Sequence, residues 1–195
     1  MLAAGLSSRM SKKNKLLLKF DNSTILEKTL NNIIHSNIYK LYVIIGSKRK
    51  EFENLLKKLN VSYIYNIKYK EGISSSIISG VNQIKDNSEG VMICLADMPK
   101  ISKKIYNKLL EEFSNIYSND QPCIIMPTFK GKSGNPVILS KHFFENIFKL
   151  KGDKGAKILI EKNNKFVKKI DICNKSILED IDNLRTYKIL LRDEK

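Results

Sequence analysis

The 195-residue sequence has no Trp, only three Cys, and 20 Asp and Glu against 35 Lys and Arg. The cysteines, Cys94, Cys123 and Cys173, are far apart and odd in number, which argues against a disulfide framework or a CxxC metal motif and favours buried thiols. No run of about 18 apolar residues could form a membrane-spanning helix, and the N-terminus lacks the apolar core of a signal peptide. We therefore expect a cytoplasmic protein without a membrane partner, folded as a single domain over residues 1–195.

The excess of cations gives a formal net charge of +15, which favours anionic partners such as nucleic acid, anionic lipid or phosphorylated small molecules. The Lys residues are spread over every predicted helix, and aromatic residues are not interleaved with them as a base-stacking groove requires. We therefore interpret most of the Lys residues as solvated surface charge and expect no specific nucleic-acid partner.

Apolar residues in helical spacing alternate along the chain with short apolar runs typical of buried strands. Thr24 and Glu27 form a capping-box pattern that predicts a helix start, and residues 41–46, 61–65, 90–96 and 123–127 are predicted strands. The alternation predicts an α/β fold in three layers around a mainly parallel sheet. In such a sheet ligands bind beyond the carboxyl ends of the strands, so the loops there are the candidate sites.

The first such loop lies in the opening stretch MLAAGLSSRMSKKNK. Gly5 permits a tight turn and close ligand approach, Ser7 and Ser8 offer hydroxyls, and Arg9 and Lys15 offer charge, a combination that suits an anion-binding nest. A surface turn with incidental cations is an equally good interpretation of this stretch alone. The sequence has neither a GxGxxG motif nor a Walker A motif, because GKS at 131–133 has Met126 where the first Gly is required.

The second candidate is LADMP, which places Asp97 at the tip of a predicted buried strand. An unpaired charge there is costly, so we favour a role for Asp97 in holding Mg²⁺, which takes few protein carboxylates together with phosphate oxygens. Capping of the helix near Ser102 is the alternative.

A late acidic stretch, LEDIDN, contains Asp180 and Asp182. These two alternate, so they would face opposite sides of an extended chain. One could cap the last predicted helix while the other faces a ligand, or either could be only an N-cap.

Three further stretches are weaker when taken alone. EGISSS is a loop leading into a helix N-terminus, which favours anions or a polar base. SGNPV is a rigid turn whose Asn135 could contact a ligand, and KGDKGAK could be a plain loop or a substrate flap. His35 and His142 are isolated, so no Ser-His-Asp or Cys-His relay can be argued.

In chain order the motifs are LAAGLSSRM, NKLLL, EGISSS, LADMP, GNPV, GDKGAK and DID. Together they closely resemble the MobA-like nucleotidyltransferases over essentially the whole chain, and within them the branch that joins CTP to molybdopterin. The resemblance implies a Rossmann-like three-layer α/β/α sandwich of the nucleotide-diphospho-sugar transferase type. It also implies transfer of CMP from CTP to the terminal phosphate of molybdopterin with release of pyrophosphate.

The resemblance also assigns roles to residues. Arg9, Lys15 and Asp97 would be catalytic, and Asp97 and Asp182 would bind Mg²⁺. Asn135, Asp153, Lys154 and Gly155 would face molybdopterin, and a recipient molybdoenzyme would be a further partner. The nucleotide would contact Leu2, Ala3, Ala4, Gly5, Ser7, Ser8, Arg9, Lys15, Gly72, Ser74, Ser75 and Asp97. The guanylyltransferase branch usually has LAGG, so Ala4 in LAAG indicates CTP rather than GTP.

The chain departs from the family pattern at three places. Ser11 replaces a Gly, which predicts a stiffer loop, and DIDNLRTYKI lacks the Pro and acid of the usual last motif. Relatives also carry several apolar residues before LAAG, so we expect a shortened first strand. Two other functions stay open: a related transferase that acts on a sugar or polyol phosphate or uses GTP, and a basic nucleic-acid-binding protein with a degenerate nucleotide site.

Overall fold

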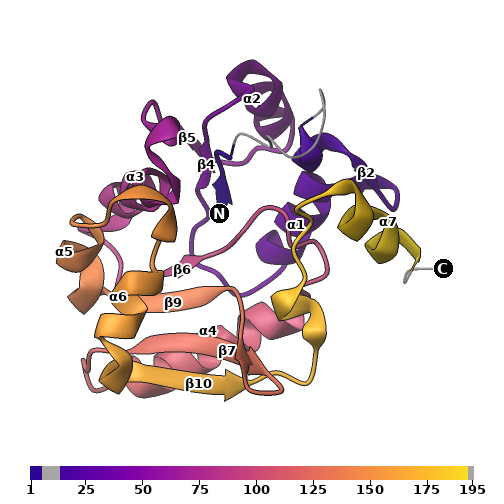
Figure 1. Ribbon diagram of the computed structural model, residues 1–195. Coiled ribbons are helices and arrows are strands. Elements are labelled where there is room, and N and C mark those ends of the chain that lie inside the picture. Colours follow the sequence, from indigo (N-terminus) through magenta and orange to yellow (C-terminus); the bar gives the residue numbers. More distant parts are fainter. Residues whose placement is uncertain (6–13, 193–195) are drawn as a thin grey trace.

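The computed structural model describes residues 1–5 and 14–192 and shows the predicted three-layer α/β arrangement (Figure 1). Its strands are β1 (Leu2–Ala3), β2 (Lys19–Phe20), β3 (Ser23–Thr24), β4 (Val43–Ile45), β5 (Tyr63–Tyr65), β6 (Gly90–Ile93), β7 (Ile124–Phe129), β8 (Lys132–Ser133), β9 (Val137–Ser140) and β10 (Val167–Asp171). Its α-helices are α1 (Ile25–Ile34), α2 (Arg49–Lys58), α3 (Ile73–Ile84), α4 (Lys103–Tyr117), α5 (Phe144–Ile147), α6 (Lys157–Lys162) and α7 (Leu184–Arg192). Within these described ranges, no helix is long and apolar enough to cross a membrane.

The central layer consists of two sheets that meet at one point. The first has the order β1-β4-β5 with parallel pairing, and the second has the order β10-β7-β9-β6, with β8 paired to β7. In the second sheet β10 runs parallel to β7, whereas β9 runs antiparallel to both β7 and β6. An isolated bridge between Leu2 and Leu95 joins the two sheets. The layer is therefore rich in parallel pairs, with antiparallel pairing centred on β9.

Alternation along the strands divides the core between the two faces of this layer. Ile125 and Ile138 belong to a core cluster that includes residues of α1, α2 and α4, whereas their neighbours Ile124 and Leu139 belong to one that includes residues of α3, α5 and α6. Because successive strand side chains point to opposite faces, each inner strand contributes to both clusters. Helices cover both faces, as the three-layer fold requires.

Local sequence signals explain several element boundaries. Thr24 accepts a hydrogen bond from the Glu27 amide while the Glu27 carboxylate accepts one from the Thr24 amide, so the predicted capping box begins α1. Ser102 is the N-cap of α4, although its side chain makes no capping hydrogen bond there. The last helix begins at Leu184, and the Asn183 side chain accepts a hydrogen bond from the Thr186 amide. The interpretation of Asp180 or Asp182 as its N-cap was therefore wrong, because Asn183 takes that role.

Candidate functional site

A cleft of about 410 Å³ opens where β1 and the segment after β6 end. Its walls come from six regions: β1 with the turn after it, the helical turn that begins at Lys15, the loop that leads into α3 with the start of that helix, the LADMP segment, the GDKG segment, and the acidic stretch before α7. The lining residues include Leu2, Ala3, Ala4, Gly5, Lys15, Leu16, Tyr69, Lys70, Gly72, Asp97, Asp153, Asp180 and Asp182. The cleft thus lies at the carboxyl ends of the parallel strands, where the fold class leads us to expect a ligand.

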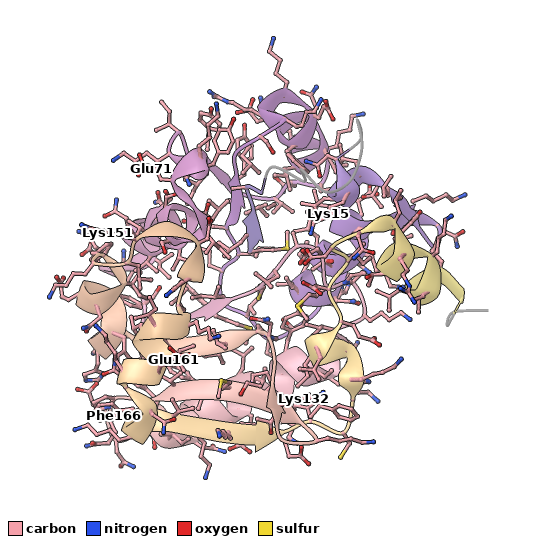
Figure 2. The ribbon with its side chains drawn as sticks, viewed as in Figure 1. Lys15, Glu71, Lys132, Lys151, Glu161 and Phe166 are labelled. Atoms are coloured by element: carbon pink, nitrogen blue, oxygen red, sulfur yellow. The ribbon has the colours of Figure 1, made fainter. Side chains whose placement is uncertain are left out.

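Lys15 is held in this cleft by a short, capped helical turn. The Asn14 side chain accepts a hydrogen bond from the Leu16 amide at 3.0 Å, and Leu16 is buried beneath it. The Lys15 ammonium donates to Asp97 Oδ2 at 2.6 Å and to Asp182 Oδ1 at 3.0 Å. Figure 2 shows Lys15 beside the segment that leads into α7, consistent with this contact to Asp182.

Two features of Ile181 bring the acidic residues together. The Ile181 amide donates to the Asp97 carbonyl at 3.0 Å, and the Ile181 side chain is fully buried in the core. With Ile181 anchored, Asp180 and Asp182 both approach Asp97, and one carboxylate oxygen from each of the three lies within 4.8 Å of the others. The expectation that Asp180 and Asp182 face opposite sides therefore does not hold here, because this stretch is not a regular strand.

The donor set fits a hard divalent cation. Asp97 Oδ2 is bonded to Lys15, but Asp97 Oδ1 is buried without a hydrogen-bond partner among the described residues. An orphaned buried carboxylate oxygen is costly, and a cation at this position would satisfy it. Three carboxylates supply the oxygen ligands that Mg²⁺ or Mn²⁺ takes.

The charges in the cleft perturb two pKa values in informative directions. Burial alone would lower the pKa of Lys15, but the charges and hydrogen bonds of Asp97 and Asp182 outweigh it and raise that pKa. Burial raises the pKa of Asp180, and the nearby Asp182 and Asp97 charges raise it further. The site therefore holds a fully charged lysine beside a carboxylate whose ionisation is disfavoured until a cation balances it.

The opposite wall depends on a glycine with a left-handed backbone. Gly72 has φ 101° and packs so closely on Gly152 that a Cβ added to it would lie 2.5 Å from the Gly152 carbonyl carbon. Asp153 Oδ1 accepts a hydrogen bond from the Ile73 amide at 3.3 Å, so its carboxylate lies at the N-terminus of α3. The GDKG segment thus packs against the EGISSS loop, which we expect to contact the nucleotide.

The structure separates the predicted site residues into three groups. Those that line the cleft are Leu2, Ala3, Ala4, Gly5, Lys15, Gly72, Asp97, Asp153 and Asp182. Those predicted to bind ligands but placed outside its lining are Ser74, Ser75, Asn135, Lys154 and Gly155. Ser7, Ser8 and Arg9 lie outside the described residues, so their predicted roles stay predictions.

Two of the residues outside the lining have visible structural roles instead. The Ser75 hydroxyl bonds the Lys68 and Gly72 carbonyls and receives a bond from the Asn66 side chain, which shapes the loop before α3. The Asn135 amide donates to the Ile177 carbonyl at 2.9 Å. Asn135 thereby supports the turn of residues 175–178, which precedes the acidic stretch.

The cleft-lining residues that sequence reasoning did not assign include Asp180, Tyr69 and Lys70. The DID pattern could have indicated Asp180. If Ile181 had been recognised as a buried core residue, both flanking aspartates would have been expected at the cleft. Tyr69 and Lys70 lie in a single 3₁₀ turn, Tyr69–Glu71, which is too short to show a periodic pattern, so no comparable signal marks them.

Known proteins similar to this chain were found at both the sequence and the structure level. A relative from Clostridium perfringens named "Probable molybdenum cofactor guanylyltransferase" is 28% identical over 168 residues, covering 86% of this chain and 74% of the relative. One from Paenarthrobacter nicotinovorans named "Nicotine blue oxidoreductase" is 21% identical over 199 residues, covering 97% and 94%. The Mycobacterium tuberculosis protein Rv0371c, solved in complex with manganese, superposes with a TM-score of 0.79 at 19% identity, covering 98% and 95%.

The structural likeness, at this identity, confirms the fold. A family profile described as "MobA-like NTP transferase domain" matches residues 1–167, most of the chain and nearly all of the residues that form the cleft. The chain therefore belongs to the MobA-like NTP transferase family and is an enzyme of the nucleotidyltransferase type.

Proposed function

We propose that this enzyme transfers CMP from CTP to the terminal phosphate of molybdopterin and releases pyrophosphate. The observation that carries the proposal is the cleft in which Lys15 and three carboxylates converge, with Asp97 Oδ1 buried and unpaired among the described residues. A triphosphate and a divalent cation are the ligands whose charges suit this arrangement.

Each residue has a defined part in the proposed reaction. Ala4 and Gly5 directly follow β1 at the cleft, and the small size of both residues lets the triphosphate approach the backbone closely. Lys15 would contribute positive charge to the phosphates, and Asp97, Asp180 and Asp182 would hold the metal. The proposed Mg²⁺ would neutralise phosphate charge and help align the reacting groups.

The chemistry is an in-line displacement at the α-phosphorus. A terminal phosphate oxygen of molybdopterin forms a bond to the α-phosphorus of CTP, the bond from that phosphorus to the bridging α–β oxygen breaks, and pyrophosphate leaves. Such a transfer needs positioning and charge stabilisation rather than a protein nucleophile. Asp153 and the loop around Gly72, on the wall opposite Lys15, would help to hold the base and the acceptor.

The name of the Clostridium perfringens relative supports molybdopterin as acceptor and favours GTP as a second candidate donor. Ala4 favours CTP, because the guanylyltransferase branch usually has Gly at this position. The two candidates share the same metal and phosphate residues and differ only in the base that is bound.

The test is a matrix of CTP, GTP, ATP and UTP against molybdopterin and a panel of sugar and polyol phosphates, with pyrophosphate release as readout. We expect kcat/KM with CTP and molybdopterin to exceed that with GTP by at least about tenfold, or about 1.4 kcal/mol. Turnover with GTP but not CTP would overturn the assignment from Ala4, and turnover only with sugar or polyol phosphates would overturn molybdopterin.

The same assay on Asp97→Asn tests the site. We expect turnover to be nearly abolished while the circular dichroism spectrum and melting temperature stay close to those of the parent. If Asp97→Asn kept full activity, the cleft would not be the active site, whatever the substrates.

A further inference from the structure

The segment that carries Asp97 follows β6 but is not itself a strand. Residues 96–99 lie outside the strands, so their buried backbone carbonyls need hydrogen-bond partners other than a neighbouring strand. Two of these carbonyls, those of Ala96 and Pro99, are bound by side chains of a single helix, α1. The two bonds lie on either side of Asp97 in the chain.

Thr29 and Asn32 supply these bonds from one face of α1. The Thr29 hydroxyl donates to the Ala96 carbonyl at 3.0 Å, and the Asn32 side-chain amide donates to the Pro99 carbonyl at 2.9 Å. Residues that are three apart in a helix are neighbours on its surface. One face of α1 therefore holds the backbone both before and after Asp97.

Thr29 is a polar residue at an otherwise apolar position. It is fully buried one turn after Ile25 and one turn before Ile33, where Val would fill nearly the same space without a polar atom. Its hydroxyl also lies 2.9 Å from the Ile25 carbonyl, but the helix already supplies that carbonyl with an amide donor. Among the described residues the Ala96 carbonyl has no other donor, so the Thr29 hydroxyl spares it a costly unmade bond.

The bond to Ala96 bears directly on the geometry of Asp97. The Ala96 carbonyl belongs to the peptide plane that precedes the Asp97 Cα. The Asp97 carbonyl belongs to the plane that follows, and it accepts a hydrogen bond from the Ile181 amide at 3.0 Å. Because peptide units are planar, the orientations of two successive planes set φ and ψ at the Cα between them. Thr29 and Ile181 together therefore restrict the direction in which the Asp97 side chain leaves the backbone.

We propose that Thr29 and Asn32 are positioning residues for Asp97: by holding the backbone on both sides of it, they direct its carboxylate toward the divalent cation. The inference rests on the metal role of Asp97 in the proposed function. Replacing a residue that orients a metal ligand commonly weakens metal binding by about 10- to 100-fold, although the residue does not touch the metal.

The test measures Mn²⁺ binding by calorimetry, without nucleotide, in the parent and in three variants. Thr29→Val keeps the shape of the side chain but removes its hydroxyl, and we expect the Mn²⁺ affinity to fall by about tenfold or more. Thr29→Ser keeps the hydroxyl and should bind Mn²⁺ as the parent does. Asn32→Ala removes the second bond and should also weaken Mn²⁺ binding, by less than Thr29→Val because Asn32 holds a more distant peptide plane.

Ser36→Ala is the matched control. Ser36 is buried just after α1, and its hydroxyl donates to the Ile33 carbonyl of that helix rather than to the segment that carries Asp97. This variant should lower the melting temperature while leaving the Mn²⁺ affinity unchanged.

The outcomes separate the positioning role from a purely structural one. If Thr29→Val and Asn32→Ala had lower melting temperatures but the Mn²⁺ affinity of the parent, the two residues would only stabilise the fold, and the proposal would be overturned. If Thr29→Val did not fold, Asn32→Ala would decide alone, because Asn32 is only half-buried. A parent that bound no Mn²⁺ would instead overturn the metal role of Asp97, and this inference with it.

Discussion

At the scale of single residues, the site depends on how three carboxylates share the positive charge of Lys15 with the proposed divalent cation. The Asp180 pKa is raised above its usual value of 3.8 by burial and by the neighbouring Asp182 and Asp97. Because the folded-state pKa lies above the unfolded-state value, ionisation costs the folded state stability as the pH rises from 3.8 towards the raised pKa, and the cost is fully present above that pKa. Protonation of Asp180 at lower pH would also remove one of the three proposed metal ligands.

We therefore expect Asp180→Asn to have opposite effects on stability and metal binding. At pH 7 the metal-free variant should melt at a higher temperature than the parent, because a like charge is removed. Its Mn²⁺ affinity, measured by calorimetry, should fall at least about tenfold, or about 1.4 kcal/mol. In the parent, the affinity should fall as the pH is lowered through the pKa of Asp180.

Glu179→Gln is the matched control, since Glu179 is adjacent but forms its ion pair with Lys175 away from the trio. It should leave Mn²⁺ affinity within about twofold of the parent. An unchanged affinity in Asp180→Asn would remove Asp180 from the ligand set.

Lys15→Ala removes the cation that faces Asp97 and Asp182. We expect kcat to fall by about 10² to 10³, the usual effect of removing one group that stabilises developing charge, with the assay run at saturating nucleotide. Lys19→Ala is the control, because Lys19 is exposed, and should retain nearly full activity. A loss confined to KM would show that Lys15 binds the ground state and the transition state equally.

At the scale of elements, the contact between the loop before α3 and the GDKG segment holds one wall of the cleft. A Cβ at Gly72 would overlap the Gly152 backbone and would also sit at φ 101°. We expect Gly72→Ala to lower the free energy of unfolding by about 2 kcal/mol and to weaken nucleotide binding, measured by denaturant titration and by calorimetry.

Gly131→Ala is a control that separates the effect of backbone strain from that of steric overlap. Gly131 also has a positive φ, 77°, but a Cβ added there meets nothing within 4 Å. It should lower stability by about 1 kcal/mol through strain while nucleotide affinity stays unchanged. If both variants bound nucleotide as the parent does, the packing of Gly72 on Gly152 would be irrelevant to the site.

Elements with strong local signals were predictable, and those that depend on distant packing were not. The capping box at Thr24 predicted the start of α1, and the apolar runs predicted β4, β6 and β7. The antiparallel direction of β9 has no local signature, because its residues, Val137–Ser140, could equally form a parallel strand. The joint position of Asp180 and Asp182 depends on burial of Ile181, which only the folded core reveals.

At the scale of the whole molecule, the net charge of +15 should act against the compact state. Raising NaCl from 20 to about 200 mM shortens the screening length to below about 10 Å, and we expect the melting temperature of the metal-free protein to rise by a few degrees. The measurement is a calorimetric scan at each salt concentration. A steady fall in melting temperature with salt would show that attractive ion pairs outweigh the repulsion.

The meeting point of the two sheets gives the cleft a further property. Ala3 to Gly5 extend from one sheet, and Leu95 to Asp97 follow the edge strand of the other, joined by the bridge between Leu2 and Leu95. A ligand that contacts both of these segments binds only while the two sheets are packed together. Binding therefore stabilises the packed arrangement of the sheets by mass action. A bound nucleotide would therefore hold the two sheets together. We expect the two sheets to unfold more cooperatively when the nucleotide is bound than when it is absent.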